Sequence, residues 1–337
     1  MTPHRNAARR LAATATALAV SAALAGCGSG EGGGGGAEAD ADSTFTIGTQ
    51  PWLGYGPWYI AQDQGFDQDH DISVDLVNFS TDDQVTAALA SGKMDAANVA
   101  THTALKLMSA GVEISIVLVQ DVSTTADAIA ATGLSEVSEL KGKKVAYEEG
   151  TTSDILLQAA LAKNDMTIED ITKVPLPASD AGGALLAGRT QVAVTYEPYL
   201  SEALNADKGV ELLYTAAEDP GIISDVLVVR NEVIEKSPET VQAAVDAWMD
   251  SIDYYNSDQE DAQQIISAGV GAERADLISA FEGVEFYDLA ANKEQLTGAF
   301  ADEVINNVAD AAINAGIFAE APPMDGAIDP TFVEAAE

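Results

Sequence analysis

Apolar residues recur along the chain in two alternating patterns, beginning near residue 44. Short runs that are continuously apolar or alternate with polar residues predict strands, as at Ile72–Val77 and Val112–Val119. Between such runs lie segments like Val85–Ala90, which follow a Ser/Thr/Asp cluster and end near a glycine, as helices do. Strands that alternate with helices in this way predict an α/β fold with parallel strands.

The pattern of strand and helix occurs twice. The expected strands are Phe45–Thr49, Ile72–Val77, Met94–Val99, Val112–Val119, Lys143–Tyr147, Ile171–Val174, Val192–Thr195 and Val226–Val229. The helices between them are expected at Trp58–Gln64, Val85–Ala90, Ala104–Met108, Asp154–Ala162 and 179–187. The segments Leu89–Ala97 and Leu185–Ala193 align without a gap, which indicates two similar α/β lobes.

The remainder of the chain reads as mostly helical. Apolar residues at three- and four-residue spacing, such as Val241, Val245 and Trp248, predict amphipathic helices. The expected ranges are Pro238–Tyr255, Asp261–Ala268, Arg274–Phe281 and Ala291–Asn314.

The N-terminal residues have the pattern of an export signal. Three arginines among the first ten residues precede the apolar run Leu11–Ala23, which is too short to span a membrane. The tetrapeptide Leu24–Cys27 looks like a bacterial lipobox, and Cys27 is the only cysteine, so no disulfide forms within one chain. We expect residues 1–26 to be a lipoprotein signal peptide, with a lipid on Cys27 and a flexible tether over 27–43. A plain secreted protein is the alternative.

Charge restricts the class of partner. The chain has 16 basic and 54 acidic residues, a net charge of −38, and such a surface repels phosphate. We therefore expect no nucleic acid partner. Adaptation to salt is a second explanation for the acidity, and it names no ligand.

Several motifs in order resemble one family. They are Trp52–Gln62, Ala90–Ala97, Leu140–Ala146, Tyr196–Ser201, Asp225–Arg230 and Pro238–Val241. The chain resembles the substrate-binding proteins of ABC importers, especially the nitrate/sulfonate/taurine-binding group, which shares its fold with thiamine-pyrimidine synthases.

The resemblance implies a two-lobed periplasmic-binding-protein-like fold of type II, with the C-terminal helices packed on the first lobe. Residues 44–124 and 230–337 are then the first lobe and 125–229 the second, joined by crossings near Val122–Asp127 and Asp225–Arg230. It also implies a monomer on the outer face of the cell membrane, a small-molecule ligand held between the lobes, closure on that ligand, and permease and ATPase partners.

The candidate ligand-binding residues lie where expected strands end and helices begin. They are Gln50, Trp52, Tyr55, Thr101, His102, Asp127, Glu149, Thr151, Thr152, Tyr196, Glu197 and Asp225. Helix N-termini favour an anion such as a sulfonate, nitrate or carboxylate. The acidic residues in the set, with no lysine or arginine expected beside them, favour a cationic or zwitterionic nitrogen compound stacked on an aromatic ring. We favour the second interpretation and keep the first open.

An enzyme is the alternative class. The pyrimidine synthases of this fold use pyridoxal phosphate on a lysine together with a reactive histidine. His102 is a possible histidine, but the expected cleft loops offer no lysine. The sequence also lacks a zinc-type histidine pair, a nucleophile elbow and a phosphate-binding loop. We therefore expect no catalysis, no cofactor and no metal.

Overall fold

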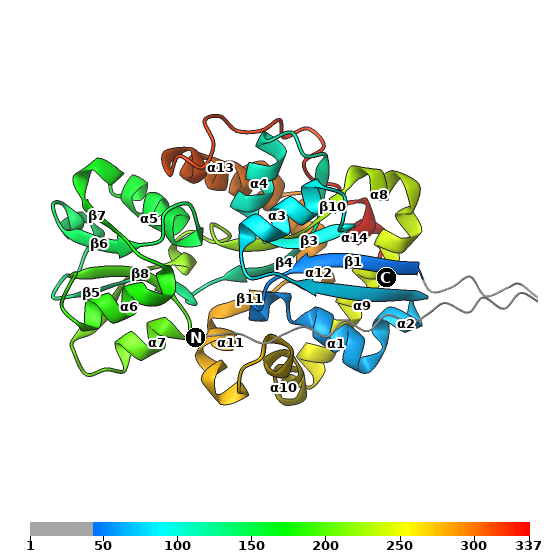
Figure 1. The fold of residues 1–337 in the computed structure, drawn as a ribbon, viewed down its shortest axis with the longest axis horizontal. Helices are drawn as coiled ribbons and strands as arrows, with labels where there is room; N and C mark the ends of the chain where they lie inside the picture. The colour runs from blue at the N-terminus through cyan, green and yellow to red at the C-terminus, as the bar shows by residue number, and fades with distance from the viewer. Residues whose placement is uncertain (1–42) are drawn as a thin grey trace, which may run out of the picture. The chain divides into compact units, whose positions relative to one another are not determined.

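The computed structural model describes residues 43–337, which fall within one compact unit, Ala41–Glu337. The expected signal peptide, Cys27 and nearly all of the expected tether lie outside the described residues. Two mixed sheets organise the unit, and each forms the centre of one lobe (Figure 1). The two-lobed α/β fold predicted from the sequence is confirmed.

The first sheet has the strand order β11-β4-β10-β3-β1-β2. Its strands are β1 (Ser43–Thr49), β2 (Ile72–Asn78), β3 (Ala96–Ala100), β4 (Ile114–Ser123), β10 (Ser224–Arg230) and β11 (Val284–Phe286). Strand β1 pairs in parallel with β2 and β3, whereas β10 is antiparallel to both β3 and β4. The sheet is therefore mixed, where the pattern of alternating strands and helices predicted parallel strands alone.

The second sheet repeats this arrangement in the order β7-β6-β8-β5-β9. Its strands are β5 (Asp127–Thr132), β6 (Lys144–Tyr147), β7 (Thr172–Pro175), β8 (Val192–Tyr196) and β9 (Val210–Thr215). Strand β6 is parallel to β7 and β8, and β5 is antiparallel to β8 and β9. Strands β5 and β10 each enter their sheet from the other lobe and are antiparallel to both of their neighbours, and β11 is also antiparallel to β4.

Two sequence assignments are wrong at these strands. The sequence analysis placed a crossing at Asp225–Arg230 and assigned residues 225–229 to the second lobe. In the structure these residues belong to β10, in the middle of the first sheet. The chain returns to the first lobe earlier, between Thr215 and Ser224. Strands β5, β9 and β11 were also missed. The run Asp127–Thr132 is buried but rich in alanine, so its sequence carries little strand preference.

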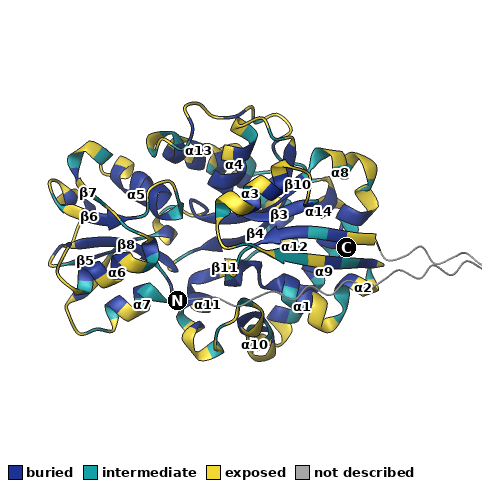
Figure 2. Ribbon diagram, viewed as in Figure 1, coloured by how far each residue is buried: buried dark blue, intermediate teal, exposed yellow. Residues whose placement is uncertain are grey.

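Helices cover the faces of both sheets (Figures 1 and 2). The first lobe holds α1 (Pro57–Gln64), α2 (Phe66–Asp69), α3 (Asp82–Ala90), α4 (Thr101–Ser109) and α8 (Asn231–Lys236). The second holds α5 (Thr152–Lys163), α6 (Ala178–Leu186) and α7 (Tyr199–Leu204). The later helices are α9 (Pro238–Ser257), α10 (Gln259–Val270), α11 (Ile278–Gly283), α12 (Leu289–Leu296), α13 (Ile305–Asn314) and α14 (Thr331–Ala335).

The late helices pack mainly on the first lobe, as expected. Helix α9 contacts β1, β2 and α1, and it buries Val241, Val245 and Trp248. The expected single helix Ala291–Asn314 is interrupted: α12 ends at Leu296, and a π-helical turn, Phe300–Val304, precedes α13. The interruption follows Gly298, where a Cβ would stand 2.7 Å from the carbonyl oxygen of Glu294. Arg274–Phe281 is likewise divided, into a 3₁₀ turn and α11.

Apolar packing continues from one lobe to the other. Helix α13 contacts α4 of the first lobe and α5 of the second, and one buried cluster includes Leu105, Val308 and Leu156. Burial of apolar surface of this kind contributes roughly 25 cal/mol per Å². The lobes are therefore held by side chains as well as by the two crossings.

Candidate functional site

The aromatic loop after β1 contributes one side chain to the contact between lobes and one to the interior. The Trp52 ring lies edge to face against Tyr196 of the second lobe, with ring centroids 6.4 Å apart, and Tyr196 meets Tyr199 at 5.5 Å. Tyr55 is buried, and its hydroxyl donates to Asp225 Oδ1 at 3.0 Å. Gln50 is partly exposed, and its carbonyl accepts the Trp52 N–H at 2.8 Å.

The second tryptophan of this loop motif belongs to the core. Trp58 is fully buried and lies against Trp248, with ring centroids 4.9 Å apart. Its Nε1 donates to Asn98 Oδ1 at 3.0 Å. An aromatic loop of this kind could offer both tryptophans to a ligand, but Trp58 is fully buried and takes no part in a binding surface.

Three buried carboxyl groups converge where the lobes meet. Asp225 on β10 stands opposite Asp121 on β4 in the register of the first sheet, and Asp127 begins β5 of the second sheet. Their exposed fractions are 9%, 2% and 7%. Like charges directly opposite each other on neighbouring strands destabilise a sheet, so this arrangement calls for a physical explanation.

Burial perturbs the titration of all three groups. Desolvation, reinforced by the charges of Asp127 and Asp82, raises the pKa of Asp225 to about 7. Desolvation also raises the pKa of Asp127 to about 6, although a hydrogen bond to Ser123 lowers it in part. The pKa of Asp121 is raised well above its usual range, first by burial and then by Asp225 and Asp127. Neighbouring buried carboxyls disfavour each other's charged form, and a nearby cation would favour that form.

Two buried polar atoms in the cluster lack hydrogen-bond partners among the described residues: Asp121 Oδ2 and Trp52 Nε1. The indole N–H makes no hydrogen bond of good geometry, yet it lies close enough to the Asp225 carboxylate to lower its pKa. Both atoms pack against Gly54, where a Cβ would stand 2.2 Å from Asp121 Oδ2 and 2.4 Å from Trp52 Nε1. Only glycine leaves room for them.

Asp121 was missed by the sequence analysis. Two signals could have found it: a charged residue just beyond the apolar run Val112–Val119, and the glycine at position 54. Neither indicates by itself that the two meet, since they lie far apart in the chain.

Glu197 is buried near Asp127, and serine residues donate hydrogen bonds to both of its carboxylate oxygens. Its Oε2 accepts the Ser201 N–H and the Ser279 hydroxyl, each at 3.1 Å, and its Oε1 accepts the Ser201 hydroxyl at 2.9 Å. Ser201 lies in α7 of the second lobe and Ser279 in α11, so the Glu197 carboxylate links the two lobes. The peptide bond between Glu197 and Pro198 is cis.

Glu149 lies apart from the buried carboxyls. It is exposed, and its Oε1 accepts Lys173 Nζ at 3.1 Å, so the expectation that no basic residue stands beside these acids is wrong here. Within residues 43–337, none of the eight ion pairs involves Asp121, Asp127, Glu197 or Asp225.

The predicted residues at helix starts are largely engaged with their own surroundings. Thr101 is buried, and its hydroxyl lies 2.8 Å from Ser224 Oγ. His102 is also buried, and desolvation followed by the charge of Lys106 lowers its pKa to about 4, which keeps the ring neutral.

The start of α5 already faces a carboxylate. Thr151 Oγ1 donates to the Glu148 carbonyl at 3.1 Å, and Thr152 begins the helix. Asp154 Oδ2 accepts the Gly150 N–H at 3.0 Å. A ligand anion at this helix N-terminus would therefore meet the negative charge of Asp154.

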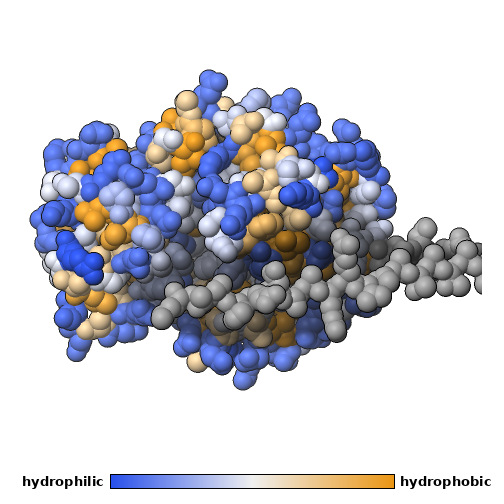
Figure 3. Space-filling view, in the orientation of Figure 1, coloured by the Kyte–Doolittle hydropathy of each residue, from blue (hydrophilic) through white to orange (hydrophobic). Residues whose placement is uncertain are grey.

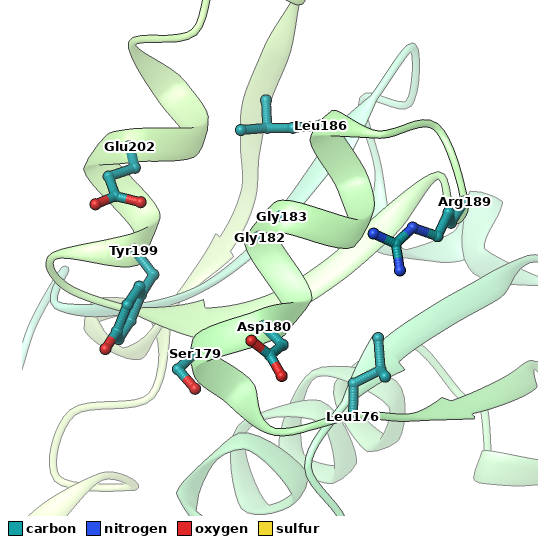
Figure 4. Close-up of a pocket in the computed structure, with 9 residues that line it drawn as sticks. All are labelled: Leu176, Ser179, Asp180, Gly182, Gly183, Leu186, Arg189, Tyr199 and Glu202. Carbon is teal, nitrogen blue, oxygen red and sulfur yellow. The ribbon is translucent and has the colours of Figure 1, made fainter.

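A surface pocket of about 430 Å³ lies elsewhere, on the second lobe between α6 and α7 (Figure 4). Asp180 and Arg189 are among its lining residues, and none of the predicted site residues is. Hydrophilic residues dominate the face of the molecule in Figure 3, with scattered apolar spots. In residues 43–337, no cluster of three or more histidine, cysteine or acidic side chains is placed to hold a metal ion. No helix within this range has the length and apolarity required to cross a membrane.

Comparison with known proteins gives the family. The model of the NMT1-like family matches residues 38–269, more than half of the chain. The chain belongs to the NMT1-like family. It is 24% identical over 257 residues to a provisionally named binding protein of Brucella abortus, a match that covers 76% of each.

Solved structures agree on the fold. The periplasmic aliphatic sulphonate-binding protein of Escherichia coli matches with a TM-score of 0.73 at 19% identity, over 85% of this chain and 92% of that one. The ligand-binding component of an ABC-type import system from Staphylococcus aureus, solved with zinc bound, matches with a TM-score of 0.69 at 17% identity, over 88% and 99%. The resemblance predicted from the sequence motifs is confirmed.

Proposed function

We propose that this chain is the extracytoplasmic solute-binding component of an ABC importer and that its ligand is a small cationic or zwitterionic nitrogen compound. The observation that carries the ligand class is the convergence of Asp121, Asp127 and Asp225, from both lobes, without an ion-pair partner among the described residues. A cation between the lobes would neutralise these groups and would favour closure of the lobes around it.

A simple anion is the competing ligand class, and two facts favour it. The similar protein of Escherichia coli is titled as a sulphonate-binding protein, and helix N-termini attract anions. Against it stand the three buried carboxyls and the engagement of Asp154 and Thr101 with neighbouring protein groups. An anion at this site would meet the charge of Asp127 in a poorly solvated region, which is strongly unfavourable.

Catalysis has little support in the chemistry of these residues. His102 is buried with a pKa lowered to about 4, and its Nε2 lies 3.3 Å from the hydroxyl of its neighbour Thr103. Lys173, the basic residue paired with Glu149, is exposed and lies apart from the buried carboxyls. We therefore place the chain among binding proteins, with the ligand released to the permease unchanged.

The N-terminal sequence supports a lipid anchor. We propose that residues 1–26 are removed, that Cys27 receives a lipid, and that residues 27–43 tether a monomer to the outer face of the cell membrane beside its permease and ATPase. Cys27→Ser should move the protein from the membrane fraction to the soluble fraction. Firm retention of the variant in membranes would contradict lipidation.

The ligand class is tested by thermal shift. The purified protein is melted in the presence of amines, amidines, guanidine, pyrimidines, taurine, alkane sulfonates and nitrate. A ligand at a hundred times its dissociation constant stabilises the fold by roughly 2.7 kcal/mol. We expect stabilisation by nitrogen cations or zwitterions, with affinities then measured by calorimetry. Stabilisation by sulfonates and nitrate alone would reject the cationic class and leave the solute-binding function standing.

A further inference from the structure

The residues at the contact between lobes offer two different ways to hold a cation. An aromatic face such as that of Trp52 attracts any cation, including quaternary ammonium groups that have no N–H. A buried carboxylate additionally requires hydrogen-bond donors, because its lone pairs lose water on burial. Which of the two dominates decides the chemistry of the ligand.

One carboxyl oxygen of Asp121 lacks a hydrogen-bond donor among the described residues. Its Oδ2 is buried and makes no hydrogen bond with the described residues, while the residue as a whole is 2% exposed. Native proteins leave few buried polar atoms unpaired, and each such atom calls for an explanation. Gly54 beside this oxygen has no side chain, and the Trp52 indole N–H, which packs against the same glycine, makes no hydrogen bond with the oxygen.

Asp225 completes the arrangement. It stands opposite Asp121 on the neighbouring antiparallel strand, and one of its oxygens, Oδ1, is occupied by the Tyr55 hydroxyl at 3.0 Å. The second oxygen and Asp121 Oδ2 remain for other partners. The two side chains come from strands of one sheet, so their relative position does not depend on how the lobes open.

We propose that Asp121 and Asp225 form a seat for a ligand cation that carries at least two N–H donors, one for each carboxyl, and that this seat discriminates against quaternary ammonium ions. The inference rests on the proposed cationic ligand class and adds the residue, Asp121, that sets its selectivity. A primary ammonium, amidinium or guanidinium group meets the requirement. A tetramethylammonium ion carries the same charge but leaves the buried Asp121 oxygen unpaired.

The experiment measures binding of four probe cations to the full chain in detergent by calorimetry: methylammonium, acetamidinium, methylguanidinium and tetramethylammonium. Asp121→Asn keeps the shape of the side chain and removes its charge. Asp225→Asn is the second variant, since its amide oxygen still accepts the Tyr55 hydroxyl. Asp253→Asn, at an exposed position of α9, is the control for the loss of one negative charge.

We expect the three N–H cations to bind wild type at least tenfold more tightly than tetramethylammonium. Each variant weakens a hydrogen bond between the cation and a charged carboxylate. N–H cations should therefore bind Asp121→Asn and Asp225→Asn roughly ten- to a hundredfold more weakly than wild type. Asp253→Asn should bind like wild type. Two results would contradict the proposed role of Asp121 and Asp225: wild type binding tetramethylammonium as tightly as the N–H cations, or Asp121→Asn binding the N–H cations as tightly as wild type. Either result would still leave a cation-binding protein. Failure of wild type to bind any of the four cations would reject the cationic ligand class as well.

Discussion

Trp52 of the first lobe meets Tyr196 of the second edge to face, with the ring planes at 88°. The contact joins a loop that follows β1 to the last residue of β8. It is made by side chains alone and joins two lobes that are expected to separate, so it should break when they do. Trp52 is also only partly buried, which leaves its ring available to a ligand.

Trp52→Ala should therefore weaken ligand binding while leaving the melting temperature of the free protein nearly unchanged. Loss of a cation–π contact of about 0.5–2 kcal/mol corresponds to a roughly two- to thirtyfold loss of affinity. Calorimetry with the ligand found in the screen measures it. A double-mutant cycle of binding free energies, with Trp52→Ala and Tyr196→Ala, should give a coupling of about 0.5–1.5 kcal/mol between the two rings. A large fall in melting temperature would show instead that Trp52 is a core residue.

Trp58→Ala should have the opposite profile. The side chain is fully buried against Trp248 and donates to Asn98, so its removal leaves a cavity and loses one of the hydrogen bonds that Asn98 Oδ1 accepts, the other coming from Gln120 Nε2. Substitutions of buried tryptophan by alanine cost about 3–5 kcal/mol. Denaturant unfolding of the ligand-free variant measures this loss. Normal stability together with abolished binding would show instead that Trp58 contacts the ligand.

These two tryptophans show what the sequence can and cannot predict. Both lie in one aromatic, glycine-rich motif, and the sequence pattern places that motif between a strand and a helix. Which indole ring faces inward depends on the turn Leu53–Tyr55 and on Trp248, nearly two hundred residues later. Local patterns predict local elements well, whereas burial depends on contacts between distant segments.

The same limit applies to strands and charges. The β-branched run of β10 was identified as a strand, but its place in the first sheet depends on pairing with β3 and β4. Of the acidic residues singled out near strand ends, Asp127 and Asp225 do lie near each other, yet Asp121 was missed and Glu149 proved to pair with Lys173. In a chain with 54 acidic residues, composition cannot separate a buried carboxyl from a solvated one.

Asp225 should make stability depend on pH in a predictable direction. Burial raises its pKa to about 7 in the folded chain, against about 4 in an unfolded one. Between these values the folded chain retains a proton that the unfolded chain has released. The free energy of unfolding therefore falls as pH rises from about 4 to about 7. The contribution is fully present below pH 4 and is lost above pH 7.

Asp225→Asn removes this contribution, because the amide does not titrate, and it also removes the Asp225 charge that helps raise the pKa of Asp121. The melting temperature of the variant minus that of wild type should increase as pH rises from about 5 to about 8. Comparison at the same pH cancels the opposite effect of His102, whose lowered pKa makes stability fall as pH drops through 6 to 4. Asp121, Asp127, Asp82, Tyr55 and Trp52 face the Asp225 carboxyl and stay in place in both proteins. A difference that does not vary with pH would contradict the raised pKa.

Asp127 and Glu149 provide a matched test of whether the second lobe contributes charge to cation binding. Both are acids of that lobe, and conversion of either to its amide removes one negative charge. Asp127 is buried beside Asp225 and Glu197, whereas Glu149 is exposed and paired with Lys173. Exposed charges are screened by salt beyond about 8–10 Å, and a surface ion pair contributes little.

Asp127→Asn should therefore weaken binding of the cation, and Glu149→Gln should leave affinity within about twofold of wild type. The loss in Asp127→Asn should persist at high salt, because a buried charge is poorly screened. Calorimetric titrations of both variants at low and high ionic strength measure the contrast. Equal losses in the two variants that vanish together in salt would mean that only the overall negative field attracts the ligand. Tighter binding by Asp127→Asn would identify an anionic ligand, since removal of a buried like charge relieves repulsion.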